Sequence, residues 1–312
     1  MRSQRATIVA LTVLLALIAA SPMLVVIGRG LAPGAAATWT HLAATALPGM
    51  VANTLILIVL VSAGVTAGGT LAGWLVARRR FPGSGFFEWA LLLPLAMPAY
   101  VMAYAYTDFL QYAGPVQSWL RATFGWSRAD YWFPDVRTVG GAALMFVFAL
   151  YPYVYLLARV AFQERPPVLV EAARTLGVSR AAAFWRVELP LARPAIAAGV
   201  SLALMETLAD FGTVAYFGVE TFTTGIYRAW FALGDRAAAA QLATVLLVFV
   251  VGAVVLERAS RGRQRTFGAA RGRPGTRFAM QRLTGWRAGA ATLVCAIAVT
   301  VGFALPVLLL VR

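Results

Sequence analysis

The residues with the clearest chemical potential are two carboxylates that stand four positions apart in an otherwise apolar stretch. Glu206 and Asp210 lie between Ala195 and Phe217, and residues four apart share one face of a helix. Thr213 and Phe217 continue that face. A carboxylate inside a bilayer is costly, so we expect these side chains to face a bundle interior or a water-filled path. The pair could form hydrogen bonds to neighbouring helices, line a route for a ligand, or do both.

A second informative stretch, from Glu171 to Pro190, is a polar loop between two apolar segments. Pro166 and Pro167 suit the start of a helix, where a missing N–H costs little. Glu171 lies near that start, where the helix dipole stabilises a carboxylate. Gly177 can adopt the left-handed conformation that ends a helix. The loop is therefore predicted to begin with one short helix that ends at Gly177.

The remainder of this loop predicts a second short helix. Ser179 can cap a helix over Arg180–Glu188, and Pro190 is expected to end it. This helix carries Phe184 and Trp185 among basic side chains. A short helix of this composition just outside a membrane is suited to lie in a groove on a partner protein, and an ordinary amphipathic loop is the alternative.

The composition places both stretches in a membrane protein. Of the 312 residues, 61% are hydrophobic and only 12% are charged. All 27 basic residues are arginines, and the net charge of +15 lies in short loops between apolar spans, which argues against nucleic-acid binding. Cys295 is the only cysteine and His41 the only histidine, which excludes an intramolecular disulfide and a histidine-based metal cluster.

Seven segments are long and apolar enough to cross a bilayer, which predicts an all-α polytopic membrane protein. They cover Thr7–Ile27, Leu55–Val76, Phe87–Tyr106, Val139–Leu157, Ala195–Phe217, Ala237–Leu256 and Ala288–Val311. The first could be a signal peptide, but its length favours an uncleaved anchor. A cytoplasmic N-terminus puts twenty arginines inside and seven outside, as the positive-inside rule requires. This orientation also puts the Glu171–Pro190 loop in the cytoplasm.

Small residues and prolines in these spans predict where helices approach closely and where they bend. The second span contains two GxxxG motifs, which begin at Gly64 and Gly69 and let helices approach closely. Pro94 and Pro98 are expected to kink the third span or to end its helix early.

Tryptophans gather in the outside loop between Thr107 and Thr138. Trp119, Trp126 and Trp132 all lie within it. They suit either an interfacial aromatic belt or a docking surface for an external binding protein.

The spacing of the polar loop resembles the EAA loop of ABC importer permeases. The sequence Glu-Ala-Ala is followed by a glycine six residues after the glutamate, and by Leu-Pro that ends thirteen residues after that glycine. In that family the loop forms a coupling helix that docks on the cytoplasmic ATPase subunit. The resemblance therefore assigns ATPase coupling to Glu171, Ala172, Ala173, Gly177, Leu189 and Pro190.

Within that family, the chain is similar to the ferric-iron importers over nearly all of residues 1–257. The similarity rests on Glu206–Gly218, Thr221–Trp230, Tyr151–Tyr155 and Leu93–Tyr100. It implies a bacterial inner-membrane subunit that works with an external iron-binding protein and a dimer of ATPase subunits. The ATPase would use ATP, and no cofactor is expected on this chain. Glu206, Asp210 and Thr213 are the candidates for the translocation path.

The resemblance also divides the chain into three parts. Residues 1–257 form a six-span permease unit with the coupling loop at 164–194, residues 258–287 an Arg- and Gly-rich cytoplasmic linker, and residues 288–312 a seventh span. This last span repeats the Ser21-Pro22 pattern of the first as Leu305-Pro306. In the ferric group two halves are commonly fused, so we expect a truncated or split permease that needs a second half or forms a homodimer. A natural seven-span protein is the alternative.

The sequence leaves three functions open. It contains no phosphate loop of the GxxxxGK[ST] kind, so the chain is predicted not to be an enzyme. The leading function is the translocation subunit of an ATP-driven importer of ferric iron. Import of thiamine, a polyamine or an oxyanion by the same class of transporter is the first alternative. A secondary transporter that moves protons or cations past Glu206 and Asp210 is the second. Membrane lipid is an expected partner and nucleic acid is not.

Overall fold

The computed structural model describes residues 2–32, 35–164, 167–262 and 281–311. Regular structure in these ranges is helical apart from two strands of two residues each. Among the described residues, six helices are long and apolar enough to cross a membrane, and a bent pair of helices raises the number to seven. The prediction of an all-α polytopic membrane protein is confirmed.

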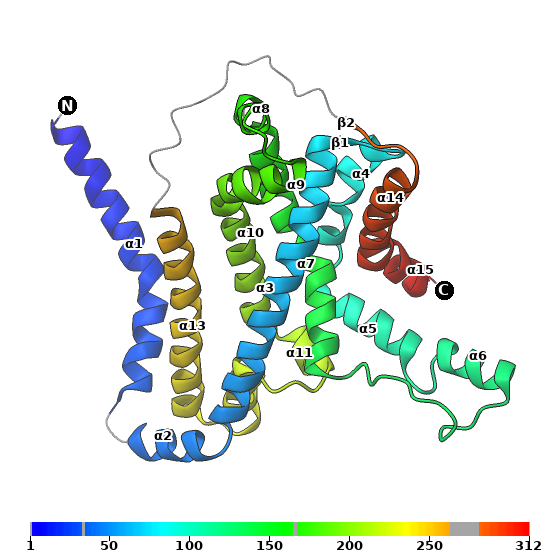
Figure 1. Cartoon of the computed structure of the whole chain (residues 1–312). Helices are drawn as coiled ribbons and strands as arrows, with labels where there is room; N and C mark the ends of the chain where they lie inside the picture. Colours follow the sequence, from blue (N-terminus) through cyan, green and yellow to red (C-terminus); the bar gives the residue numbers. More distant parts are fainter. Residues whose placement is uncertain (1, 33–34, 165–166, 263–280, 312) are drawn as a thin grey trace. The chain divides into compact units, whose positions relative to one another are not determined.

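The chain forms two compact units. The first comprises Met1–Thr54 with Glu220–Val251, and the second comprises Leu55–Val219 with Gly252–Arg312. The first unit holds the helices α1 (Arg2–Gly30), α2 (Ala35–Ala44) and α12 (Phe222–Tyr227), the π-helical turn η3 (Arg228–Ala232), the beginning of α3 (Leu47–Arg78) and most of α13 (Arg236–Gly262) (Figure 1). Its core packs around Leu42, Met50, Phe222 and Leu242.

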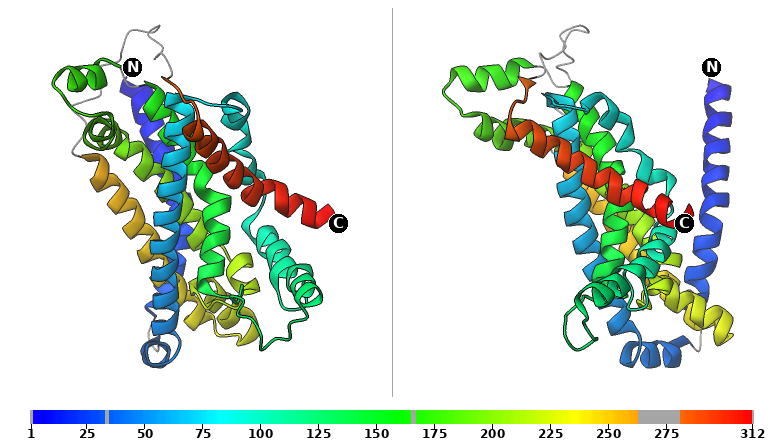
Figure 2. Two further views of the ribbon diagram at one scale, coloured as in Figure 1. Left: turned by 45° about the vertical axis from the view of Figure 1, so that its right-hand side comes forward. Right: turned by 90° about the vertical axis from the view of Figure 1, so that its right-hand side faces the viewer.

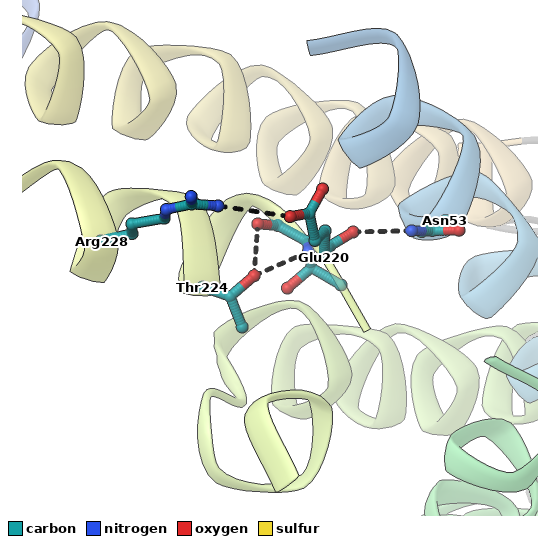
Figure 3. Close-up of polar contacts among 5 residues, drawn as sticks. Asn53, Glu220, Thr224 and Arg228 are labelled. Atoms are coloured by element: carbon teal, nitrogen blue, oxygen red, sulfur yellow. Dashed lines mark hydrogen bonds and ion pairs between the residues drawn. The ribbon is translucent and has the colours of Figure 1, made fainter. Parts of the chain in front are cut away.

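A polar corner fixes the start of α12 in the first unit (Figure 3). The Asn53 side-chain amide donates to the backbone carbonyl of Glu220 at 2.9 Å. Thr221 and Thr224 form a reciprocal capping box. Arg228 and Glu220 pair at 3.5 Å, but both side chains are exposed, so this ion pair adds little stability.

The second unit holds the remaining elements. They are β1 (Arg79–Arg80), α4 (Ser84–Ala90), the 3-10 turn η1 (Leu93–Ala96), α5 (Ala99–Leu110), α6 (Pro115–Phe124), α7 (Val139–Glu164), α8 (Pro167–Thr175), α9 (Arg180–Ala183), the π turn η2 (Phe184–Glu188), α10 (Leu189–Ala209), α11 (Gly212–Tyr216), β2 (Gln281–Arg282), α14 (Trp286–Val299), the π turn η5 (Thr300–Ala304) and α15 (Leu305–Val311). The strands β1 and β2 pair in parallel.

Helix α7 is the most buried span, and α3 and α10 pack on it (Figure 1). A Cβ added at Gly69 of α3 would lie 2.6 Å from the Cβ of Val154, and one added at Gly199 of α10 would lie 2.7 Å from the Val154 Cα. Glycine therefore lets two helices contact one residue of α7 from two sides. The predicted close approach is confirmed at Gly64 and Gly69, whereas Gly68 has open space beside it.

The third span is bent rather than straight. The segments Ser84–Ala96 and Ala99–Phe124 meet at an angle of 90°. Met97, which precedes Pro98, is extended, as the clash with a following proline ring favours. Pro94 lies in the 3-10 turn just before this bend. The predicted early end of the helix at these prolines is confirmed.

The last helical segment, formed by α14, η5 and α15, runs across the second unit, as both views of Figure 2 show. The Tyr106 hydroxyl of α5 donates to the Val301 carbonyl at 2.6 Å. Gly302 lies close to Pro94 and to the carbonyl of Phe148.

Residues 263–280, the middle of the predicted 258–287 linker, lie outside the described residues, and the preceding residues extend α13 to Gly262.

Candidate functional site

The first helix of the polar loop ends in a glycine turn, as predicted. Gly177 has a φ of +83°, in the left-handed region. The Val178 N–H donates to the Ala173 carbonyl and the Gly177 N–H donates to the Arg174 carbonyl, both at 3.0 Å. This pair of bonds is the Schellman motif, which satisfies carbonyls at the end of α8 and reverses the chain. Pro167 is the first residue of α8, while Pro166 lies outside the described residues.

The second helix of the loop begins as predicted but does not end as predicted. The Ser179 hydroxyl accepts from the Ala182 N–H at 3.3 Å, which confirms the cap. Beyond Ala183 the helix widens into the π turn η2, where the Leu189 N–H donates to the Phe184 carbonyl five residues back. The prediction that Pro190 ends the helix is therefore wrong.

The physical reason lies in the position of the π turn. Pro190 has no N–H to lose and its ring needs room beside the preceding turn. A π turn widens the helix at that place, so α10 continues through Pro190 into the membrane span. The same arrangement recurs at the π turn Thr300–Ala304, which directly precedes Leu305-Pro306.

The end of this loop is anchored to α3 by a carboxylate that the sequence analysis did not assign. Glu188 accepts from the Trp74 indole N–H at 2.7 Å and lies 3.8 Å from Arg78. The side chains of Glu188 and Arg78 are only 11% and 7% exposed. Trp74 and Arg78 are four apart on α3, so they face Glu188 together. The sequence signal for this anchor is a tryptophan and an arginine four residues apart at the end of a span.

Aromatic packing supports the same anchor. The Phe184 ring lies 5.2 Å from Trp74 in an edge-to-face arrangement and 6.5 Å from Phe162 of α7. Its neighbour Trp185 is 65% exposed, and Leu176 in the glycine turn is 84% exposed. Phe184 therefore fixes the loop to the span helices, while Leu176 and Trp185 are large apolar side chains that remain exposed.

The residues assigned to coupling are spread along this loop. Glu171, Ala172 and Gly177 are exposed. Ala173, Leu189 and Pro190 are half-buried, the last two at the start of α10. The six residues are thus brought to one connected helix–turn–helix, with the outermost ones accessible to a partner.

The helix of the fifth span ends earlier than predicted, and this changes the candidate path. Helix α10 ends at Ala209, and Asp210 is extended. Thr213 lies on the separate short helix α11. The prediction that Glu206, Asp210 and Thr213 share one helix face is therefore wrong, because the helix breaks between the first and the second of them.

The break is stabilised by the Asp210 carboxylate itself. It accepts from the Thr213 N–H at 2.8 Å, from the Thr213 hydroxyl at 3.1 Å and from the Val214 N–H at 3.4 Å. These bonds satisfy N–H groups at the start of α11, where a carboxylate is also favoured by the helix dipole. Asp210 is half-buried, whereas Glu206 is exposed on the surface of α10.

A pocket of about 560 Å³ lies at the outside loop, between α5 and the segment after α6. The Tyr131 hydroxyl donates to the Gln117 side chain at 2.8 Å, and Arg121 stacks on Tyr112 at 4.0 Å. Hydrogen bonds from the Ser127 hydroxyl and N–H lower the pKa of Asp130. Trp119, Trp126 and Trp132 are exposed by 61%, 38% and 86%.

No group of three or more His, Cys, Asp or Glu side chains that could hold a metal ion occurs in the part of the chain that the structure describes. Cys295 is a buried thiol in α14.

Comparison with known proteins identifies the chain. Residues 69–265 match the model of the family described as "Binding-protein-dependent transport system inner membrane component". The chain is 28% identical over 223 residues to the Fe(3+)-transport system permease protein FbpB 2 of Haemophilus influenzae, which covers 72% of this chain and 40% of the relative. It is 32% identical over 148 residues to the sulfate transport system permease protein CysT of Escherichia coli, covering 47% of this chain and 50% of the relative.

Other similarities agree with this match. The molybdenum transport system permease protein ModB of Escherichia coli is 28% identical over 189 residues, which covers 59% of this chain and 80% of that protein. A chain in the crystal structure of a bacterial alginate ABC transporter, in complex with an alginate pentasaccharide-bound periplasmic protein, has a TM-score of 0.62 at 16% identity. This alignment covers 83% of the present chain and 96% of the other and shows a shared fold. The present chain spans about half or less of the FbpB 2 and CysT relatives.

Proposed function

The chain belongs to the family of binding-protein-dependent transport system inner membrane components, and on this basis we propose that it is the translocation subunit of an ATP-driven importer. It is thus a multi-pass membrane protein and a transport component rather than an enzyme. Family membership favours ATP-driven import over transport driven by an ion gradient.

The observation that carries the proposal is the loop between α7 and α10. Its glycine turn and π turn form a helix–turn–helix that is anchored through Glu188 and exposes Leu176 and Trp185. A helix–turn–helix that exposes large apolar side chains has chemistry suited to dock on another protein. We assign the docked partner as a dimer of cytoplasmic ATPase subunits, and we propose a cytoplasmic N-terminus from the distribution of arginines.

The proposed ligand is ferric iron delivered by an external iron-binding protein. The match to a relative named as an Fe(3+)-transport permease extends over 72% of this chain, against 47% for the sulfate permease and 59% for the molybdenum permease. The identities of 28–32% are similar, so sulfate or molybdate is the second candidate. The outside loop with Trp119 and Trp132 is the proposed contact with the binding protein.

The proposed path passes Glu206. Its carboxylate is exposed on a span helix, and a charge there is too costly to face lipid. A second permease half, or a second copy of the chain, that covers this face would enclose Glu206 in a polar route. Asp210 and Thr213, which are bonded to each other, would shape the outer end of that route.

Deletion and complementation of the gene in its own host tests this function. Uptake of radiolabelled ferric iron, sulfate and molybdate is measured in the parent, in the deletion strain and in the complemented strain. We expect iron uptake alone to fall, to recover on complementation and to stop when cellular ATP is depleted. Selective loss of sulfate or molybdate uptake would support the oxyanion alternative. Uptake that continues without ATP would contradict an ATP-driven importer.

A further inference from the structure

A groove of about 850 Å³ in the second unit lies between the end of α3, the turn η2 and the start of α14. The parallel pair of β1 and β2 brings the two helix ends together, as Figure 1 shows at the label β1. The inner wall is apolar and includes Leu71, Leu75 and Val294. The groove thus joins an apolar wall to a pair of polar strands.

The outer rim of this groove is basic. Arg79, Arg282 and Arg287 line it, and no aspartate or glutamate is among its described lining residues. Arg79 stacks on Trp74 at 4.8 Å and donates to the Gln281 side chain, which fixes its guanidinium at the rim. Arg282 and Arg287 are exposed. The rim therefore has the positive charge that an anionic group would need.

The groove also lies at a membrane boundary. The span in α3 ends at Arg78, and the last span begins at Trp286. At 1.5 Å per residue, Leu71 lies about 12 Å and Val294 about 10 Å from the arginines of their own segments toward the membrane interior. Tryptophan prefers the headgroup region, and both Trp74 and Trp286 line the groove. Its rim therefore faces headgroups while its wall faces acyl chains.

From this arrangement we propose that the groove is a binding site for an anionic phospholipid. The planar fork of arginine matches phosphate oxygens, so Arg282 and Arg287 hold the headgroup phosphate with Arg79 beside them. One acyl chain lies along Leu71, Leu75 and Val294. This site is separate from the proposed translocation route and does not depend on which ligand is imported.

Native mass spectrometry of the purified full chain tests the site. The protein is incubated with phosphatidylglycerol or with phosphatidylcholine of identical acyl chains. We expect the unchanged protein to retain phosphatidylglycerol at least about tenfold more strongly than phosphatidylcholine. The double variant R282Q/R287Q should retain phosphatidylglycerol at least about tenfold more weakly than the unchanged protein does. The matched control is R128Q/R137Q, which removes the same charge from exposed sites of the outside loop. It should retain the lipid as the unchanged protein does.

Two further measurements keep the test decisive if R282Q/R287Q is poorly folded. R282K/R287K keeps the charge but loses the planar fork, and it should retain an intermediate amount of lipid. Retention by the unchanged protein should also fall as ionic strength rises. Equal retention of the two lipids, as expected if a partner protein occupies the groove, would overturn the proposal. An equal loss in R128Q/R137Q would also overturn it.

Discussion

The two ends of α10 use carboxylates in opposite ways. At its start Glu188 is 11% exposed, accepts from Trp74 and faces Arg78. Near its end Glu206 is exposed, and the helix breaks four residues later at Asp210. The first end is continuous with the loop through a π turn, whereas the second is interrupted. Glu188 thus fixes the helix to the chain's own core. Glu206 is exposed in a span, and we propose that its partner comes from outside the chain.

The largest effect on stability is expected at the anchored end. Replacement of Glu188 by alanine removes the carboxylate that faces the guanidinium of Arg78, whose side chain is 7% exposed. Breaking a buried ion pair from one side costs about 3 kcal/mol, so Glu188→Ala should lower the free energy of unfolding by about that amount. Denaturant unfolding of the purified protein in detergent measures it. Glu164→Ala, at an exposed site on α7, is the control and should change the value by less than about 0.5 kcal/mol.

A smaller effect is expected at the glycine turn that precedes this anchor. Nothing lies within 4 Å of a Cβ added at Gly177, so a substitution acts only through its φ of +83°. A β-branched residue in the left-handed region costs about 2 kcal/mol, which corresponds to about thirtyfold in affinity if the docked loop requires this turn. Gly177→Val should weaken co-purification with the ATPase subunit by this factor and leave membrane insertion intact.

Gly177→Asn is the matched control for the turn. Asparagine tolerates the left-handed conformation, so this variant should bind the ATPase nearly as well as the unchanged chain. Full association and uptake by Gly177→Val would show that the turn is not needed for docking. Equal losses in both variants would show that the side chain, rather than the backbone conformation, is responsible.

The contrast between the two ends also separates what local sequence determines from what it does not. Gly177, Ser179 and the bend at Pro98 were predictable, because each depends on the conformational preference of one residue and its neighbours. The anchoring role of Glu188 depends on Trp74, which lies 114 residues earlier in the sequence. Periodicity within one segment contains no information about such a partner.

The two wrong predictions have a related cause. Pro190 ends an ordinary α-helix, but here a π turn precedes and accommodates it, and Phe184 in that turn packs on Trp74 and Phe162. The span near Asp210 has an uninterrupted helical pattern, but the carboxylate competes for the N–H groups of the next turn. In both places a tertiary or side-chain interaction overrides the helix geometry assumed from spacing.

At the interrupted end, a moderate effect is expected for the residue that stabilises the break. Asp210→Ala removes the acceptor for the Thr213 and Val214 N–H groups and should lower the free energy of unfolding by about 1 kcal/mol. Asp210→Asn keeps a carbonyl oxygen at the same place and should lower it by less. If Asp210→Asn reduces uptake while its unfolding is unchanged, the charge of Asp210 serves transport as well as the break. Equal unfolding of Asp210→Ala and the unchanged chain would contradict the stabilising role.

The smallest effect on stability is expected at Glu206, and there the comparison becomes a test of function. Because the side chain is exposed, Glu206→Gln should change the free energy of unfolding by less than about 0.5 kcal/mol. Uptake by cells that carry the assembled transporter should nevertheless fall about tenfold if this carboxylate lines the route. Asp108→Asn removes one charge from an exposed site on α5 and should leave uptake unchanged. Normal uptake by Glu206→Gln would exclude Glu206 from the route. A loss of stability as large as that of Glu188→Ala would mean that Glu206 is anchored in the same way, and the distinction between the two ends of α10 would not hold.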